Sequence, residues 1–344
     1  MTQARWCSFR SFELRHSFVI RHSSLVLRHS LKRPFLIVGP TATGKSELAA
    51  DVAVLVAGEI VSADAFQIYR GLEVLSAKPE AATLRKAPHH LIGTLSLEQE
   101  MNAEKFRIEA AREIAEIRSR GRAPIVVGGS GLYIKALTHG LMTLPASDRK
   151  LRDELNELTL EQARARLIDL DPEAARTIDL KNRRRLLRAL EICLLTGQPA
   201  SAQRREWAPV AGVADPGLPR STTVATTSGV FVFRDREELY QRINERVERM
   251  FKNGVIDEVG GLGAISSTAS KMIGLAEVRQ LLDGKISMSQ CIARIQQTTR
   301  RYAKRQLTWF ARQSKFEPLN LSVLSYGQAV DRIAQRVSLL CEQG

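Results

Sequence analysis

The stretch GPTATGKS at residues 39–46 decides the fold of this 344-residue chain. It comprises Gly39, Pro40, Thr41, Ala42, Thr43, Gly44, Lys45 and Ser46. This stretch satisfies the phosphate-binding pattern GxxxxGK[ST]. Its glycines let backbone amides turn toward a phosphate, and its lysine adds a positive point charge. An ordinary glycine-rich turn is the alternative, but an apolar run before the stretch and a helical pattern after it favour a phosphate-binding loop, or P-loop.

The segments on either side alternate between short apolar runs and amphipathic helices. We expect strands at residues 34–38, 59–62, 90–94, 125–127 and 230–233. The helix after the loop has Leu48, Val52 and Leu55 on one face, and we expect it to end at Gly58. Such alternation is typical of a parallel sheet covered by helices.

Changes in pattern divide the chain into four parts. Residues 34–145 and 206–320 form the expected core with C-terminal helices, and residues 321–344 a C-terminal segment. Between 146 and 205 the strand signal gives way to charged helical periodicity. Residues 1–33 carry seven basic residues against one acid, as in an organelle transit peptide, but we interpret them as a dispensable or mis-started extension, expected to be disordered. The predicted fold class is α/β, a P-loop NTPase-like parallel sheet core with an all-helical insertion domain.

Charge and cysteine content limit the partners and the compartment. The chain has 51 Lys and Arg against 37 Asp and Glu, a net charge of +14, and it keeps +8 without residues 1–33. This excess indicates a polyanionic partner, nucleic acid first. No apolar run approaches the roughly 18 residues of a membrane span. The four cysteines form no CxxC pair, which argues against a zinc site or a disulfide framework. We therefore expect a cytoplasmic protein without membrane contact. We also expect a monomer, an expectation that does not rest on the charge or the cysteines.

Two further residues are expected beside the P-loop. Asp64 follows the second strand, so it should lie at the carboxyl edge of the sheet, where ligands of open α/β sheets bind. A carboxylate there fits a magnesium ligand, a general base or the N-cap of the next helix. Ser130 follows Gly128 and Gly129 at the end of another strand. Its hydroxyl fits a ligand contact or a helix N-cap equally well.

A basic segment lies near the C-terminus. Residues 291–316 hold seven basic residues and no acid, on an expected long helix with Tyr302, Trp309 and Phe310. Cations interleaved with aromatic rings suit RNA phosphates and stacked bases. A solvated helix face is the alternative interpretation.

Seven motifs in order resemble those of the tRNA dimethylallyltransferases, the tRNA isopentenyltransferase family. They are GPTATGKS, SADAFQIYRG, SAKP, PHHLI, PIVVGGSGLYIKAL, RRLLRALEICLLTGQP and TRRYAKRQLTWF. The resemblance covers nearly all of residues 35–310. It implies transfer of a dimethylallyl group from dimethylallyl diphosphate to the exocyclic amine of the adenosine 3′ of the anticodon, with release of diphosphate. It also implies Mg²⁺ as cofactor and the tRNA anticodon stem-loop as partner.

The resemblance assigns roles residue by residue. Asp64 is the base that accepts the amine proton, with Ser130 and Lys45 as further catalytic residues. Residues 39–46 and Arg236 bind the diphosphate, and Ser46 binds Mg²⁺. The implied tRNA contacts are Asp64, Ala65, Phe66, Gln67, Ser130, Arg152, Arg184, Arg185, Leu186, Leu187, Arg188, Arg300, Arg301, Lys304 and Arg305.

The chain departs from the family pattern at a few positions. Ala65 replaces the usual serine, Arg184 a glutamine and Asn182 an aspartate. The segment IGLAE at residues 273–277 replaces a family segment with aromatic and basic residues, and Ser130 replaces a threonine. These positions concern recognition of the substrate or the tRNA.

Three rival functions stay open. An adenylate isopentenyltransferase would modify free nucleotide, and it needs no basic helical surfaces. A P-loop kinase or NTPase would use ATP. A non-catalytic RNA-binding protein is disfavoured, because Lys45, Ser46 and Asp64 are all present.

Overall fold

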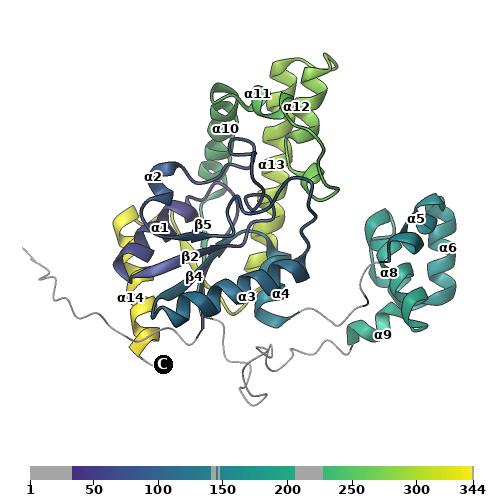
Figure 1. Ribbon diagram of the computed structural model, residues 1–344, viewed down its shortest axis with the longest axis horizontal. Coiled ribbons are helices and arrows are strands. Elements are labelled where there is room, and N and C mark those ends of the chain that lie inside the picture. The colour runs from purple at the N-terminus through teal and green to yellow at the C-terminus, as the bar shows by residue number, and fades with distance from the viewer. Residues whose placement is uncertain (1–32, 141–144, 146–147, 206–227, 343–344) are drawn as a thin grey trace, which may run out of the picture.

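The computed structural model describes residues 33–140, 145, 148–205 and 228–342 (Figure 1). Its centre is a six-stranded parallel sheet with the order β3-β2-β4-β1-β5-β6. The strands are β1 (Phe35–Val38), β2 (Gly58–Ser62), β3 (His89–His90), β4 (Ala123–Gly128), β5 (Gly229–Phe233) and β6 (Glu317–Asn320). Strand β1 is fully buried between β4 and β5, with Ile37 paired to Val127 and Val230. The P-loop therefore leaves the sheet at its centre, on the carboxyl edge.

Helices cover both faces of the sheet (Figure 1). On one face, α1 (Lys45–Leu55) and α14 (Tyr326–Glu342) enclose an apolar cluster with β1, β2 and β4. On the other face lie α3 (Ala103–Ser119), α4 (Gly131–His139) and the C-terminal part of α13 (Met288–Ala311). There the rings of Phe106 and Tyr133 stack with their centroids 4.3 Å apart. Burial of these aliphatic and aromatic side chains is the main favourable contribution to the stability of the core.

A third group of helices stands at the carboxyl edge of the sheet. It consists of α10 (Arg236–Lys252), α11 (Val255–Gly260), the 3₁₀ turn η1 (Ala269–Lys271), α12 (Leu275–Leu282) and the first half of α13. The short α2 (Ala81–Leu84) precedes β3. Val247 of α10, Leu275 of α12 and Ile295 of α13 share one apolar cluster. This packing holds α10 and α13 firmly above the P-loop.

Five helices fall within residues 146–205 and stand beside the core in Figure 1. They are α5 (Arg149–Glu157), α6 (Leu160–Leu170), α7 (Pro172–Thr177), α8 (Arg183–Thr196) and α9 (Ala200–Arg205). They share a separate apolar cluster that includes Leu167 and Leu186. Side chains cap four of them, with Thr159 and Gln162 forming a capping box at α6. The division of the chain into domains stays a prediction.

The predicted α/β fold with its parallel sheet is confirmed, but several element predictions are wrong. Helix α1 ends before Gly58, which begins β2, because the turn comes at Ala57 with a φ of 49°. Leu55 is 60% exposed rather than buried. Strand β3 spans only His89–His90. Strand β6 and helix α14 were not expected. Pro318 lies in β6, which is an edge strand, where a missing N–H is tolerated.

Parts of the chain for which the sequence gives expectations lie outside the described residues. Residues 1–32 and 206–227 lie outside the described part. None of the described helices is long and apolar enough to cross a membrane. Cys193, Cys291 and Cys341 are free and buried, while Cys7 falls outside the described range.

Candidate active site

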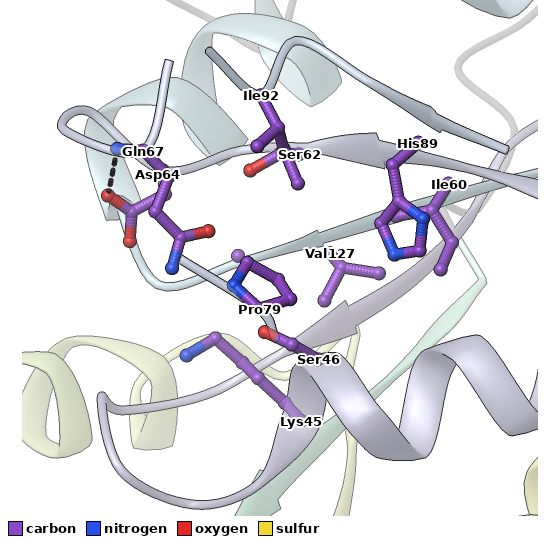
Figure 2. Close-up of a pocket in the computed structure, with 11 residues that line it drawn as sticks. Lys45, Ser46, Ile60, Ser62, Asp64, Gln67, Pro79, His89, Ile92 and Val127 are labelled. Carbon is purple, nitrogen blue, oxygen red and sulfur yellow. Dashed lines mark hydrogen bonds between the residues drawn. The ribbon is translucent and has the colours of Figure 1, made fainter. Parts of the chain in front are cut away.

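Three loops meet at the carboxyl edge of neighbouring strands. They are the P-loop after β1, a turn after β2 that carries Asp64, and the glycine pair after β4 that precedes Ser130. The backbone N–H of Ala65 donates to Ser130 Oγ at 3.0 Å, which ties the second loop to the third. Figure 2 shows Lys45 and Ser46 facing Asp64 and Gln67 across a pocket that all four line. The fold thus brings the three predicted catalytic residues to one place.

The P-loop has the backbone of an anion-binding loop. Ala42 and Gly44 take left-handed φ angles of 66° and 89°, a conformation that alanine adopts rarely. Thr43 Oγ1 and Lys45 Nζ both donate to the carbonyl of Pro40, at 3.0 and 3.1 Å. Burial lowers the pKa of Lys45 to about 8, and the carboxylate of Asp64 opposes this fall. A lysine with this pKa favours an anionic ligand that would stabilise its charged form.

Arg246 of α10 belongs to the site, although the sequence analysis missed it. Its Nη1 donates to Thr41 Oγ1 at 2.7 Å. Burial lowers its pKa to about 10, again against the effect of Asp64. Its Nε is buried and has no hydrogen-bond partner among the described residues. Arg246 and Lys45 are therefore two cations near the carboxylate of Asp64, and an unused donor of Arg246 remains for a ligand.

Arg236, expected at the diphosphate, makes a different contact. It is exposed at the start of α10, and its guanidinium lies 5.2 Å from the ring centroid of Tyr240. In the described structure the arginines that contact the P-loop are Arg234, Arg242 and Arg246. No described hydrogen bond joins Arg236 to the P-loop, and its assignment to the diphosphate stays a prediction.

Asp64 is oriented by the turn that follows it. Its Oδ1 accepts from the backbone N–H groups of Phe66 and Gln67, at 2.9 and 3.3 Å. Residues 65–68 form a turn and not a helix, so Asp64 caps a turn rather than a helix. Its Oδ2 accepts no hydrogen bond from any described residue. One oxygen thus fixes the carboxylate and the other is available as a base.

Ser130 and Gln67 both make hydrogen bonds within the protein. Ser130 occupies the N-cap position of α4, yet its side chain makes no capping bond, so the N-cap interpretation is wrong. Burial, and next the carboxylate of Asp64, raise the pKa of the neighbouring Tyr302 to about 12. Gln67 lines the pocket and donates to the carbonyl of Ala77 at 2.9 Å. Its amide nitrogen is therefore held by the protein.

Gln306 of α13 is a second residue that sequence analysis missed. Its Oε1 accepts from the N–H of Thr41 at 2.9 Å, and its Nε2 donates to the carbonyl of Gly129 at 2.8 Å. A Cβ on Gly129 would lie only 2.4 Å from Gln306 Nε2, so glycine is required there. Gln306 is 6% exposed and joins the P-loop to the loop after β4. The signal in the sequence that could have pointed to this role was a glutamine placed among the basic residues of an expected helix.

Comparison with known proteins identifies the family. The family model described as IPP transferase matches residues 67–313. The chain belongs to the IPP transferase family. A tRNA dimethylallyltransferase of Akkermansia muciniphila is 40% identical over 286 residues, covering 83% of this chain and 92% of that relative. One of Geobacter sulfurreducens is 42% identical over 283 residues, covering 80% and 88%. The resemblance found from the motifs is confirmed.

Solved structures of the IPP transferase family share this fold. The full-length tRNA isopentenylpyrophosphate transferase of Bacillus halodurans is 31% identical, with a TM-score of 0.63, covering 90% of this chain and 97% of that one. A eukaryotic dimethylallyltransferase, described as acting on tRNA, has a TM-score of 0.71 at 26% identity, covering 89% and 77%.

The predicted contact residues of the insertion separate into two kinds in this IPP transferase. Arg184 and Arg185 are exposed at the start of α8. Leu186 and Leu187 are buried in the apolar cluster of the insertion, so their assignment as tRNA contacts is corrected to a packing role. Arg152 and Arg188 pair with the buried carboxylate of Glu191, at 2.6 and 2.7 Å. The Arg152–Glu191 pair joins α5 to α8, whereas the Arg188–Glu191 pair lies within α8.

Helix α13 likewise presents two faces. Gln306 and Phe310 are buried, while three of the four cations predicted as tRNA contacts on this helix are exposed. We name these three the α13 cations: Arg301, Lys304 and Arg305. Arg300 is half-buried and donates to Asn244 Oδ1 at 2.7 Å. Arg300 is therefore the one of these four cations that a hydrogen bond within the described structure already engages.

Proposed function

We propose that this IPP transferase moves a dimethylallyl group from dimethylallyl diphosphate to the exocyclic amine of the adenosine 3′ of the anticodon in tRNA, releasing diphosphate. One observation carries the proposal. Two partly buried cations, Lys45 and Arg246, face a fixed carboxylate, Asp64, at the mouth of a P-loop. The named relatives, the tRNA dimethylallyltransferases, support the reaction class.

The donor half of the site stabilises a leaving group. The bond between the allylic carbon and the diphosphate oxygen breaks, and negative charge grows on the diphosphate. The P-loop amides, Lys45 Nζ and the free Nε–H of Arg246 would hold that charge as it develops. Positive potential fixed in advance lowers the barrier, because it needs no reorganisation during the reaction.

The residues present fit Mg²⁺, which would neutralise charge on the diphosphate when bound. Mg²⁺ usually keeps several waters and takes one or two protein ligands together with substrate phosphates. Ser46, at the first turn of α1, lines the same pocket as Asp64. Within the described residues no group of three or more His, Cys, Asp or Glu side chains forms a separate metal site. Ser46 would supply the protein ligand.

The acceptor half of the site removes a proton. The adenine amine forms a bond to the allylic carbon, and its excess proton passes to Asp64 Oδ2. The turn amides that bind Oδ1 keep Oδ2 directed into the pocket. A positioned base of this kind contributes about 10²–10⁴ to the rate.

The tRNA would contact two basic surfaces. Arg184 and Arg185 are exposed on the insertion, and the α13 cations are exposed on the core. Burial lowers the pKa of Lys271 on the core, and Arg184 and Arg152 of the insertion lower it further. Phosphate contacts on both sides can offset the few kcal/mol needed to unstack a loop base. In this proposal the enzyme is a cytoplasmic monomer.

The test is an incubation of purified protein with labelled dimethylallyl diphosphate, and separately with tRNA, AMP or ATP as the second substrate. We expect label in tRNA and none in AMP. Label in AMP alone would establish an adenylate isopentenyltransferase, and hydrolysis of ATP without prenyl transfer would establish an NTPase. The Asp64→Asn protein, which keeps the side-chain shape, is the matched control and should bind both substrates.

A further inference from the structure

Two arginines outside the pocket hold the outer side of the P-loop. Arg242 Nε donates to the carbonyl of Ala42 at 2.9 Å, and Arg234 Nε donates to the carbonyl of Thr43 at 2.9 Å. Arg234 follows strand β5 and Arg242 lies two turns into α10, so both come from about 200 residues further along the chain. Consecutive carbonyls of the loop are thus bound from outside.

These bonds fix which way the loop amides point. In a trans peptide the C=O and the N–H point in opposite directions. The peptide whose carbonyl binds Arg242 carries the N–H of Thr43, and the peptide whose carbonyl binds Arg234 carries the N–H of Gly44. Neither N–H has an acceptor among the described residues. The two arginines therefore turn two unused donors toward the inner side of the loop, where an anion binds.

The loop conformation requires such support. Ala42 has a φ of 66°, which a residue with a Cβ adopts at a cost, and Arg242 binds the carbonyl of this same residue. Arg234 is itself fixed, because its Nη1 donates to Glu238 Oε1 at 2.6 Å and to the carbonyl of Leu321 at 3.0 Å. Thus α10 and the strand that enters it form a frame behind the loop.

We propose that Arg234 and Arg242 are positioning residues that set the two peptide planes of the P-loop and thereby its affinity for the diphosphate, without touching the diphosphate. The inference rests on the proposed function for the identity of the anion. It differs from the role of Arg246, which donates to the side chain of Thr41 and keeps a buried Nε–H without a partner among the described residues.

The test compares variants that keep or lose the geometry. Arg242→Lys keeps the charge but loses the donor at the position of Nε. We expect its affinity for inorganic diphosphate, measured by calorimetry, to fall about tenfold, the effect of one lost charge-assisted hydrogen bond. Arg234→Lys should behave alike. Lys252→Ala, which removes an exposed cation from the end of the same helix, should bind diphosphate within about twofold of wild type.

Further measurements separate positioning from general damage. The KM for dimethylallyl diphosphate should rise in Arg242→Lys while the affinity for tRNA and the melting temperature without ligand stay near the wild-type values. Wild-type diphosphate affinity in both lysine variants would overturn the positioning role. Equal losses of diphosphate and tRNA affinity would overturn it too, because they indicate a damaged fold. A wild-type protein that binds diphosphate but never prenylates tRNA would overturn the proposed function alone.

Discussion

Replacing Gln306 with leucine tests how the P-loop is held in place. The side chain is buried and bridges the N–H of Thr41 and the carbonyl of Gly129. Leucine has a similar volume, so the apolar packing of α13 is kept. The substitution removes both hydrogen bonds and leaves two backbone groups without their partner.

The magnitude follows from those two groups. A buried polar group without a partner costs about 1–3 kcal/mol. The N–H of Thr41 is only partly buried, which places its cost at the lower end. We expect Gln306→Leu to lower the free energy of unfolding of the core by about 2–4 kcal/mol. Because the P-loop loses an anchor at Thr41, the KM for dimethylallyl diphosphate should also rise.

Urea denaturation followed by circular dichroism measures the first effect, and steady-state kinetics with each substrate varied in turn measures the second. Gln297→Leu makes the same chemical change at an exposed position of the same helix and serves as control. Its unfolding free energy should stay within about 0.5 kcal/mol of wild type. Equal stability of the Gln306→Leu and wild-type proteins would refute the bridging role.

Four further predictions concern charge. The affinity for diphosphate should fall as the pH rises through about 8, where Lys45 loses its proton; Lys45→Ala should bind more weakly and lack this step. The pKa of Lys45 is about 8 in the folded protein and 10.5 in an ordinary lysine, so unfolding takes up a proton between pH 8 and 10.5. The contribution of Lys45 to the free energy of unfolding should therefore rise with pH in this range, and denaturation at pH 8 and at pH 10 measures it. Arg246→Ala should reduce diphosphate affinity in calorimetry at least tenfold more than Arg236→Ala, and the reverse order would restore the sequence assignment. Replacing all three α13 cations with glutamine should reduce the steepness of log tRNA affinity against log salt by about two, as measured by filter binding. An unchanged slope would show that the α13 cations are a solvated helix face and do not contact tRNA.

The sequence predicted the parts of the site that are local. Lys45, Asp64 and Ser130 each follow a strand of one parallel sheet within a few residues, so topology alone places them at the same edge. It could not predict the residues that reach the loop from distant helices. Arg246 is 205 residues from its partner Thr41, and Gln306 is 265 residues from it. Only the packing of α10 and α13 decides which of many arginines and glutamines face the loop.

Two errors have simple physical causes. Leu186 and Leu187 lie within a basic motif, but their apolar side chains form the core of the insertion, as helical periodicity requires. Strand β6 carries Pro318 and has only one fully buried residue. It therefore lacks the apolar run by which the inner strands are recognised.

The most direct measurement of the central claim locates the transferred group. Wild-type and Asp64→Asn proteins would each be incubated with labelled dimethylallyl diphosphate and tRNA under single-turnover conditions, and the tRNA then digested and sequenced by mass spectrometry. The wild-type protein should label the adenosine 3′ of the anticodon, on its exocyclic amine. The Asp64→Asn protein should do so about 10²–10⁴ times more slowly. Label at another nucleotide, or equal rates in the two proteins, would contradict the account.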